Sequence, residues 1–424
     1  MASPDDRRRP RLGFVFHPRS FGTLAIVDAA RNLCDVVWLV DTADARLGSM
    51  TRLLARVGTV VDVAGVSGAE AAQMVRDERL DGVLALADDL LEWTAELADR
   101  LGLPFHSVQT ARLLTDKFAQ RSALRAAGLP APRSWVLHRR LSEDEWMRVA
   151  EDEPFPGVLK PRQGEGSRNT NAVGSIAEVR SIVAGSGEAE HGSEAREWVL
   201  EEYIEDVDAE LCGEGFANYV SVESFVAAGQ VTTLAITGRT PPARPFRETG
   251  FFIPAAISQE QAGPIVDAAT AAAHALGITV GCLHTEVKLT PTGPVVIEVN
   301  GRIGGGVPEL LDLTTGIDFL GIALRLALGE SVEVGPVQPN GLGYLLYVQA
   351  RDDIHRITAV TGLDDLRVMP GVQEVVLNRG PGHAVDWRDG NHGHVYSVLG
   401  TAGDHDGLRA AIGRVTELVR IDGV

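Results

Sequence analysis

The stretch LHTEVKLTPTGPVVIEVNGRIGGG (residues 283–306) holds two runs in which apolar and polar residues alternate, and Pro-Thr-Gly separates the runs. Alternation with a period of two predicts strands that bury one face, and turn residues between two such runs predict a β-hairpin. If the hairpin is symmetric about Thr292, Glu286 lies directly opposite Glu298. We therefore expect two antiparallel strands that bring two carboxylates together.

The same alternation predicts which side chains share a face of the hairpin. The polar face is expected to carry His284, Glu286, Lys288, Glu298, Asn300 and Arg302. The opposite face is expected to enter a core with Leu283, Val287, Leu289, Val295, Ile297 and Val299.

Two carboxylates directly across a strand pair repel each other, so a divalent cation between them would explain their placement. Mg²⁺ prefers carboxylate and amide oxygens together with substrate phosphates. The residue types therefore predict a metal site of Glu286, Glu298 and Asn300. Arg302 would neutralise a phosphoryl group during transfer, so Arg302, Glu298 and Glu286 are the predicted catalytic residues. A solvated polar face is the simpler alternative, and it fits a lone Glu better than E-x-N-x-R opposite a second Glu.

The pattern E-V-K-L…I-E-V-N-G-R-I-G-G (residues 286–305) closely resembles the metal- and phosphate-binding signature of the ATP-grasp superfamily. With HTE ahead of it, the pattern is most similar to the amino-acid ligase branch. The resemblance implies an α/β fold, α+β in parts, made of four units. These are a Rossmann-like pre-ATP-grasp domain (1–110), a lid subdomain (111–200), a catalytic subdomain with an antiparallel sheet (201–335) and a C-terminal closing subdomain (336–424).

The resemblance extends back through TDKFAQRSALRAAGLPAPRSWVL (115–137), PFPGVLKPRQGEGSRNTNAV (154–173) and WVLEEYIEDVD (198–208). It implies a set of residues that bind ATP. These are Lys117 and Lys160 at the phosphates, Gly166 and Ser167 in a flexible loop, Glu201, Glu202 and Ile204 in the adenine hinge, and Asp208 at the ribose.

Substrate contacts are also implied by position in the family pattern. They are Glu223, Arg239, Glu248, His284, Gly304 and Gly305. The two glycines allow the backbone to approach a ligand closely. Phe251 and Phe252 either line the substrate pocket or belong to the core. The segment 239–250, rich in Pro and Arg, is a candidate lid.

The first hundred residues alternate between strand and helix patterns, with LGFVFH, DVVWLVD and DGVLALAD among the expected strands. Strands and helices that alternate at this spacing predict a parallel, wound sheet. Its first turn, FHPRSFG, lacks the G-x-G-x-x-G fingerprint of dinucleotide sites. We therefore expect this unit to be Rossmann-like in form only.

The 424 residues carry a net charge of −19, which disfavours a nucleic-acid partner. The sequence contains no apolar run long enough to span a membrane, and no apolar segment of a secretory signal follows the charged N-terminus. Cys34, Cys212 and Cys282 lack disulfide or metal-ligand spacing, which favours packed thiols in the cytoplasm. The sequence leaves open whether the protein forms a homodimer.

The resemblance implies a ligase that uses ATP and Mg²⁺, with two metal ions expected and Mn²⁺ able to substitute. It would activate a carboxylate as an acyl phosphate, join it to an amine, and release ADP and phosphate. The expected product is an amide similar to a dipeptide, with amino acids as substrates. Three alternatives stay open: a ligase similar to biotin carboxylase, a purine-pathway ligase, and a nucleotide-binding module without turnover.

Overall fold

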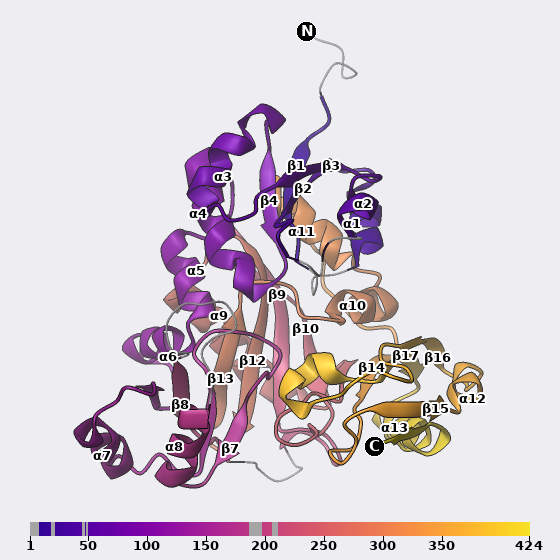
Figure 1. Ribbon diagram of the computed structural model, residues 1–424. Helices are drawn as coiled ribbons and strands as arrows, with labels where there is room; N and C mark the ends of the chain where they lie inside the picture. The colour runs from indigo at the N-terminus through magenta and orange to yellow at the C-terminus, as the bar shows by residue number, and fades with distance from the viewer. Residues whose placement is uncertain (1–7, 18–21, 45–46, 48–49, 186–196, 206–210) are drawn as a thin grey trace.

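The computed structural model describes residues 8–17, 22–44, 47, 50–185, 197–205 and 211–424. In Figure 1 a parallel sheet near the N-terminus lies at the top, and long antiparallel strands run through the centre. A second four-stranded sheet lies at the lower left, and the C-terminal part of the chain lies at the lower right. The mixed α/β architecture predicted from the sequence is confirmed.

The N-terminal sheet is parallel and has the strand order β3-β2-β1-β4. Its strands are β1 (Arg11–Val15), β2 (Asp35–Val40), β3 (Thr59–Asp62) and β4 (Gly82–Ala85). The helices here are α1 (Thr23–Ala30), α2 (Met50–Leu54), α3 (Gly68–Met74), α4 (Leu91–Leu101) and α5 (Val108–Thr115). Strand β2 is buried at every residue after the first, as in sheets covered on both faces. The predicted wound sheet is confirmed.

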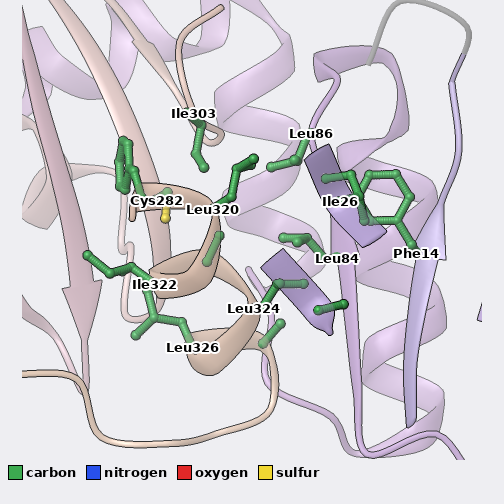
Figure 2. Close-up of a cluster of buried hydrophobic side chains, with 14 of the residues drawn as sticks. Phe14, Ile26, Leu84, Leu86, Cys282, Ile303, Leu320, Ile322, Leu324 and Leu326 are labelled. Atoms are coloured by element: carbon green, nitrogen blue, oxygen red, sulfur yellow. The ribbon is translucent and has the colours of Figure 1, made fainter. Parts of the chain in front are cut away.

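Helix α11 (Phe319–Ala327) comes from much later in the chain and packs against the N-terminal sheet. In Figure 2, Leu320 and Leu324 of α11 lie toward Leu84 and Leu86, whereas Ile322 lies on the other side of the helix, toward the strand that carries Cys282. All of these side chains belong to one apolar cluster with Phe14 and Ile26. The two backbones also meet, because a Cβ atom at Gly82 would lie 2.2 Å from the carbonyl oxygen of Ala327. The N-terminal sheet therefore shares a core with the central part of the molecule.

The second four-stranded sheet is antiparallel, with the order β5-β8-β6-β7. Its strands are β5 (Ser134–Leu137), β6 (Gly157–Pro161), β7 (Asn171–Val173) and β8 (Trp198–Glu202). Helices α6 (Lys117–Ala126), α7 (Glu143–Glu151) and α8 (Ile176–Gly185) belong to the same part of the chain. This sheet has an apolar cluster of its own, which includes Trp146 and Trp198.

The central sheet has eight strands in the order β13-β12-β9-β10-β11-β14-β17-β16, and all its pairs are antiparallel. The strands are β9 (Tyr219–Ala227), β10 (Gln230–Arg239), β11 (Gly250–Ile253), β12 (Gly281–Thr290), β13 (Gly293–Asn300), β14 (Leu342–Val348), β16 (Val372–Leu377) and β17 (Tyr396–Ala402). A small sheet pairs β15 (Ile357–Thr361) with β18 (Arg420–Gly423). The remaining helices are α9 (Gln259–Ala275), α10 (Val307–Thr315), α12 (Leu363–Arg367) and α13 (His405–Leu418).

The β12–β13 hairpin pairs Glu286 with Glu298, as predicted. The predicted centre at Thr292 is wrong, however, because Thr290 pairs with Gly293 across the turn. A β-bulge after Glu286 inserts one extra residue into β13, and this extra residue restores the predicted register beside the acidic pair.

The bulge also changes which valine faces the core. Val296 is 2% exposed and belongs to a core cluster, whereas Val295 is only half-buried. Ile297 lines the cavity described below. The prediction that Val295 and Ile297 face the core is therefore wrong, because strict alternation fails wherever a bulge adds a residue.

Helices α2, α5, α8, α10 and α11 and strands β7 and β11 were not predicted from the sequence. The hairpin β9–β10 turns at Ala228–Gly229, and both turn residues have positive φ. All three cysteines are free and buried, as predicted. In the part of the chain that the structure describes, no helix combines the length and the apolar character that a membrane span requires.

Candidate active site

A cavity of about 1660 Å³ lies between the β5–β8 sheet and the central sheet. Its walls come from β6, the loop 162–170, the residues after β8, the segment 241–251 and the β12–β13 hairpin. Further lining comes from Arg302, Ile303, Gly305 and Gly306, and from Asn391, His392 and His394. Most of the predicted site residues therefore meet in one place, although the chain brings them from segments almost two hundred residues apart.

Two lysines enter this cavity from neighbouring elements, and each is less than one-tenth exposed. Lys117 is the first residue of α6, whose N-cap Asp116 accepts a hydrogen bond from the backbone N–H of Ala119. The Nζ atom of Lys117 lies 3.2 Å from Glu298 Oε1. Lys160 lies on β6, and burial lowers the pKa of its ammonium group. The cavity thus contains two desolvated cations.

The predicted adenine hinge begins at the end of β8, which carries Glu201 and Glu202, and continues to Ile204. The Glu201 carboxylate is buried between two cations, with Lys160 Nζ at 2.8 Å and Arg121 Nε at 3.1 Å. Glu202 pairs with Arg133 at 2.6 Å, and both Glu202 and Ile204 line the cavity. The contact of Glu201 with adenine stays a prediction.

Asp208, the predicted ribose ligand, lies outside the described residues. Arg121 is fully buried and was missed by sequence reasoning, because a lone Arg within a helical pattern is typical of a solvated face.

The predicted phosphate loop carries four residues with left-handed backbone: Gly164, Gly166, Ser167 and Asn169. Gly166 and Ser167 both line the cavity, as expected. Successive residues with positive φ turn backbone N–H groups toward one side, which is the geometry of anion-binding loops. Lys117 Nζ also donates to the Gly164 carbonyl, so the first lysine is tied to this loop.

Glu286 and Glu298 are both ionised near neutral pH. Burial raises the pKa of Glu298, but Lys117, Lys160 and Arg121 outweigh burial and hold the pKa at about 2. For Glu286, the raising effect of burial is outweighed by the hydrogen bond with His284 and by the charge of Arg239, so its pKa is also lowered.

The surroundings of the Glu286–Glu298 pair suit a divalent metal ion. Asn300 lines the cavity beside the pair, and its Nδ2 donates to the His284 carbonyl at 3.2 Å. Among the described ranges, no group of three His, Cys, Asp or Glu side chains is placed to hold a metal without other ligands. Two ionised carboxylates and an amide suit Mg²⁺, because Mg²⁺ takes its remaining ligands from phosphates and water.

Arg302 lies where three parts of the molecule meet. Its Nη2 is 2.7 Å from Asp88 Oδ2, which follows β4 of the N-terminal sheet, and 3.9 Å from Glu165 of the phosphate loop. Burial raises the pKa of Asp88 to about 6, although the charge of Arg302 opposes this. Asp88 was missed, and its place at the carboxyl end of a parallel strand is the signal that could have identified it.

The predicted substrate residues form two layers. Glu248, His284 and Gly305 line the cavity. Glu223, Arg239 and Gly304 are not among the described residues that line it. They lie directly behind the wall, where Glu223 accepts from His284 Nδ1 at 2.8 Å and a Cβ atom at Gly304 would lie 2.4 Å from the same nitrogen.

Arg239 connects the buried layer to the wall. Its Nη1 lies 3.1 Å from Glu248 Oε1, and its guanidinium lies 4.0 Å from the ring centroid of Phe251. Its Nη2 lies 3.0 Å from His284 Nε2. Burial lowers the pKa of His284, but Glu223 raises it, to about 9. Nε2 accepts a hydrogen bond from Arg239 only in the tautomer that carries its proton on Nδ1.

The two phenylalanines divide between the alternatives. Phe251 lines the cavity from the edge of one core cluster. Phe252 does not line the cavity and belongs to another core cluster, where it packs on Phe216 with ring centroids 4.5 Å apart. Successive residues of β11 point to opposite faces of the sheet, which explains the division. The predicted lid, 239–250, contributes Pro241, Pro242, Arg244, Pro245 and Phe246 to the cavity.

A family model described as an ATP-grasp domain matches residues 153–309. An uncharacterized protein of Sinorhizobium fredii is 28% identical over 348 residues, which are 81% of this chain and 64% of that protein. Carnosine synthase 1 of Homo sapiens is 29% identical over 297 residues, which are 65% of this chain and 34% of the synthase. The chain therefore spans less than two thirds of the length of these relatives.

The solved structure of an L-amino acid ligase from Bacillus licheniformis superposes with a TM-score of 0.78 and 23% identity. The superposition covers 99% of this chain and 100% of the ligase. This likeness shows that the two chains share a fold, including the sheets that form the cavity.

Proposed function

We propose that the chain is an ATP-dependent carboxylate–amine ligase, and the match of an ATP-grasp family model to residues 153–309 supports this proposal. It forms an amide through an acyl phosphate and releases ADP and phosphate. One observation supports this proposal above all: the paired carboxylates Glu286 and Glu298 share a cavity with the buried Lys117 and Lys160. That set of charges suits a nucleoside triphosphate together with a bound metal ion.

ATP lies, in this proposal, between the β5–β8 sheet and the central sheet. Its phosphates lie near Lys117, Lys160 and the backbone of Gly166 and Ser167, and its adenine lies against the residues 201–204. The left-handed backbone of the loop and the desolvated lysines support this orientation. Asp208 is proposed at the ribose on the family resemblance alone.

Glu286, Glu298 and Asn300 are the residues that would hold Mg²⁺. When bound, the metal supplies positive charge to the phosphate oxygens. We propose two metal ions, with Mn²⁺ able to substitute, because both cations prefer oxygen ligands. Arg302 lies in the same wall and adds a fixed positive charge.

The reaction has two steps. A carboxylate oxygen of the first substrate attacks the γ-phosphorus, and ADP leaves. The amine nitrogen of the second substrate then attacks the acyl carbon, loses a proton, and displaces phosphate. Lys117, Lys160 and Arg302 stabilise the negative charge that develops on the phosphoryl oxygens, and the cavity walls orient the reactants.

We propose amino acids as both substrates. The names of two relatives, an L-amino acid ligase and a carnosine synthase, support this class. In this chain, Glu248 and His284 are the charged groups on the wall that suit an ammonium and a carboxylate. Glu223 and Arg239 hold these two side chains from behind, so we assign them positioning roles.

The proposed domain boundaries follow residues 110, 200 and 335. The β5–β8 sheet and the C-terminal part each have a separate apolar cluster, which supports these two units. The boundary at 110 falls within α5 and the boundary at 200 within β8, so neither coincides with the end of an element. A cytoplasmic location is proposed because all three cysteines are free thiols.

The test is ADP release by the purified chain with Mg-ATP, over pairs of amino acids and small carboxylates, followed by mass spectrometry of each positive pair. The proposal expects release that needs both a carboxylate and an amine, with a product mass equal to their condensation. Release with bicarbonate alone would instead identify a carboxylase-like reaction. Binding of ATP without release under any condition would identify a module without turnover.

A further inference from the structure

We propose that Asn391 is a positioning residue that connects the phosphate loop to Glu248, so that closing the loop over ATP also fixes the substrate wall. The inference rests on the proposed function, in which ATP binds in one half of the cavity and an amino acid binds in the other half. Asn391 lies outside the ATP-grasp match, on the segment 386–394 that precedes β17.

Three hydrogen bonds of Asn391 connect two different walls of the cavity. Its backbone N–H donates to the Gly166 carbonyl at 2.8 Å. Its side-chain Oδ1 accepts from the backbone N–H of Glu248 at 2.8 Å, and its Nδ2 donates to Glu248 Oε2 at 2.6 Å. The main chain of one residue therefore holds the phosphate loop, while its side chain holds Glu248.

The contact with the phosphate loop is tight. Gly390 has φ 63° and ψ −137°, and a Cβ atom there would lie 2.1 Å from the Gly166 carbonyl oxygen. The same Cβ atom would lie 2.8 Å from the backbone nitrogen of Arg168. One residue further along the loop, the Asn169 N–H donates to the Arg388 carbonyl at 3.3 Å. The two backbones thus pack directly on each other, which only glycine permits at this point.

The other end of the segment is anchored in the C-terminal part of the central sheet. The Val395 N–H donates to the Val348 carbonyl at 2.7 Å, and Arg379 pairs with Asp389 at 3.1 Å. Because one end is fixed, a displacement of the phosphate loop must either break the Gly166 contact or move Asn391. Movement of Asn391 would in turn shift Glu248 or break its hydrogen bonds with Asn391.

Glu248 has few other constraints that would hold its carboxylate. Arg239 Nη1 lies 3.1 Å from its Oε1, and Asn391 occupies the other oxygen. Asn is the residue that fits, because it offers one acceptor and one donor to Glu248. Asp would lose the donor and place a second carboxylate beside Glu248.

The side-chain and main-chain contacts can be separated by substitution. Asn391→Ala removes both hydrogen bonds to Glu248 and keeps the backbone bond to Gly166. Gly390→Ala disrupts the main-chain contact instead, because the added Cβ atom displaces the phosphate loop from the segment 386–394. The exposed Asn340, which lies outside the cavity lining, gives a matched control as Asn340→Ala.

The experiment is hydrogen exchange followed by mass spectrometry, with and without a non-hydrolysable ATP analogue and Mg²⁺. In the wild type and in Asn340→Ala, the analogue is expected to slow exchange in both the loop 162–170 and the segment 241–253. A coupling of ordinary size predicts a slowing of roughly 5-fold or more at the second segment. In Asn391→Ala the loop stays protected, and protection of 241–253 is lost. Gly390→Ala gives the same loss.

Equal protection of 241–253 in Asn391→Ala and the wild type would overturn the inference and leave the ligase proposal standing. Protection of the loop alone in the wild type would also overturn it. If the wild type shows no protection in either segment, the ATP site itself is wrong, and the inference fails with the proposed function. Thermal unfolding of each variant identifies any general loss of folding.

Discussion

Glu298 is surrounded by both signs of charge. It lies opposite the Glu286 carboxylate across the hairpin and 3.2 Å from the Lys117 ammonium. The cations dominate, which is why the pKa of Glu298 falls to about 2 although the group is buried. A carboxylate kept ionised in a desolvated place is well prepared to bind a hard cation, and here the cations that keep it ionised come from α6 and β6.

Glu298→Gln should therefore lower kcat by at least about 100-fold, because it removes one negative oxygen ligand while it keeps the side-chain volume. The fold should survive, since the substituted side chain has almost the same shape. Steady-state ADP release measures the first effect, and thermal unfolding measures the second. Turnover within a few-fold of the wild type would remove Glu298 from the metal site.

Glu223→Gln tests the buried layer behind the wall. Glu223 holds the His284 imidazole through Nδ1, but it does not line the cavity. We expect kcat/KM for the amino acid to fall roughly 10- to 100-fold, as for other groups that orient a functional side chain from behind. Affinity for the ATP analogue should stay unchanged. An equal loss of affinity for both ligands would show that Glu223 supports the fold instead.

Helix α6 shows how a single element places a functional group. Asp116 caps the helix through Ala119, and its carboxylate also binds the guanidinium of Arg162 at 2.9 Å. Lys117 comes directly after the cap, so the start of the helix fixes where its ammonium group lies. The cap thus joins α6 to the strand that carries Lys160.

Asp116→Ala should weaken ATP affinity about 10-fold, because it removes both the cap and the pairing with Arg162. Loss of an N-cap costs about 1 kcal/mol, and the first turn of α6 should loosen accordingly. Asp116→Asn is the matched control, since Asn also caps a helix but lacks the charge. Calorimetric titration with the ATP analogue separates the two variants, and equal affinity of Asp116→Ala and the wild type would contradict the assignment.

At the scale of the whole molecule, Arg302 and helix α11 connect the N-terminal sheet to the central part. Arg302 joins the hairpin to Asp88 of the N-terminal sheet and lies near Glu165 of the phosphate loop. Helix α11 packs its apolar face against the same N-terminal sheet (Figure 2). The N-terminal sheet therefore supports the cavity from outside, and Asp88, which follows β4, pairs with the cavity-lining Arg302.

Gly82→Ala should destabilise the protein by about 1–3 kcal/mol, because its Cβ atom would meet the Ala327 backbone and force α11 away from β4. Gly263→Ala is the control, since the Cβ atom there meets no other atom within 4 Å and α9 is a helix. Alanine in such a position should stabilise by roughly 0.5–1 kcal/mol. Chemical denaturation measures the free energy of unfolding of both variants. Equal stability of the two would show that α11 shifts to accommodate the added methyl group at little cost.

Local patterns in the sequence determined much of this protein. Period-two alternation predicts the β12–β13 hairpin and the pairing of Glu286 with Glu298, and alternation of strands with helices predicts the parallel sheet. The spacing of E-x-N-x-R places three polar groups on one face because the pleat has a fixed period. Each of these patterns depends on residues close together in the chain.

Only the tertiary structure decided the rest. The bulge that brings Ile297 to the cavity leaves no mark in the alternation, and Asp88 and Asn391 reach their partners across 214 and 143 residues of chain. Glu223 and Arg239 prove to lie behind the wall, although their sequence positions resemble those of residues on it. Contacts of this kind depend on how whole sheets pack, and packing places side chains together without any periodic signature along the sequence.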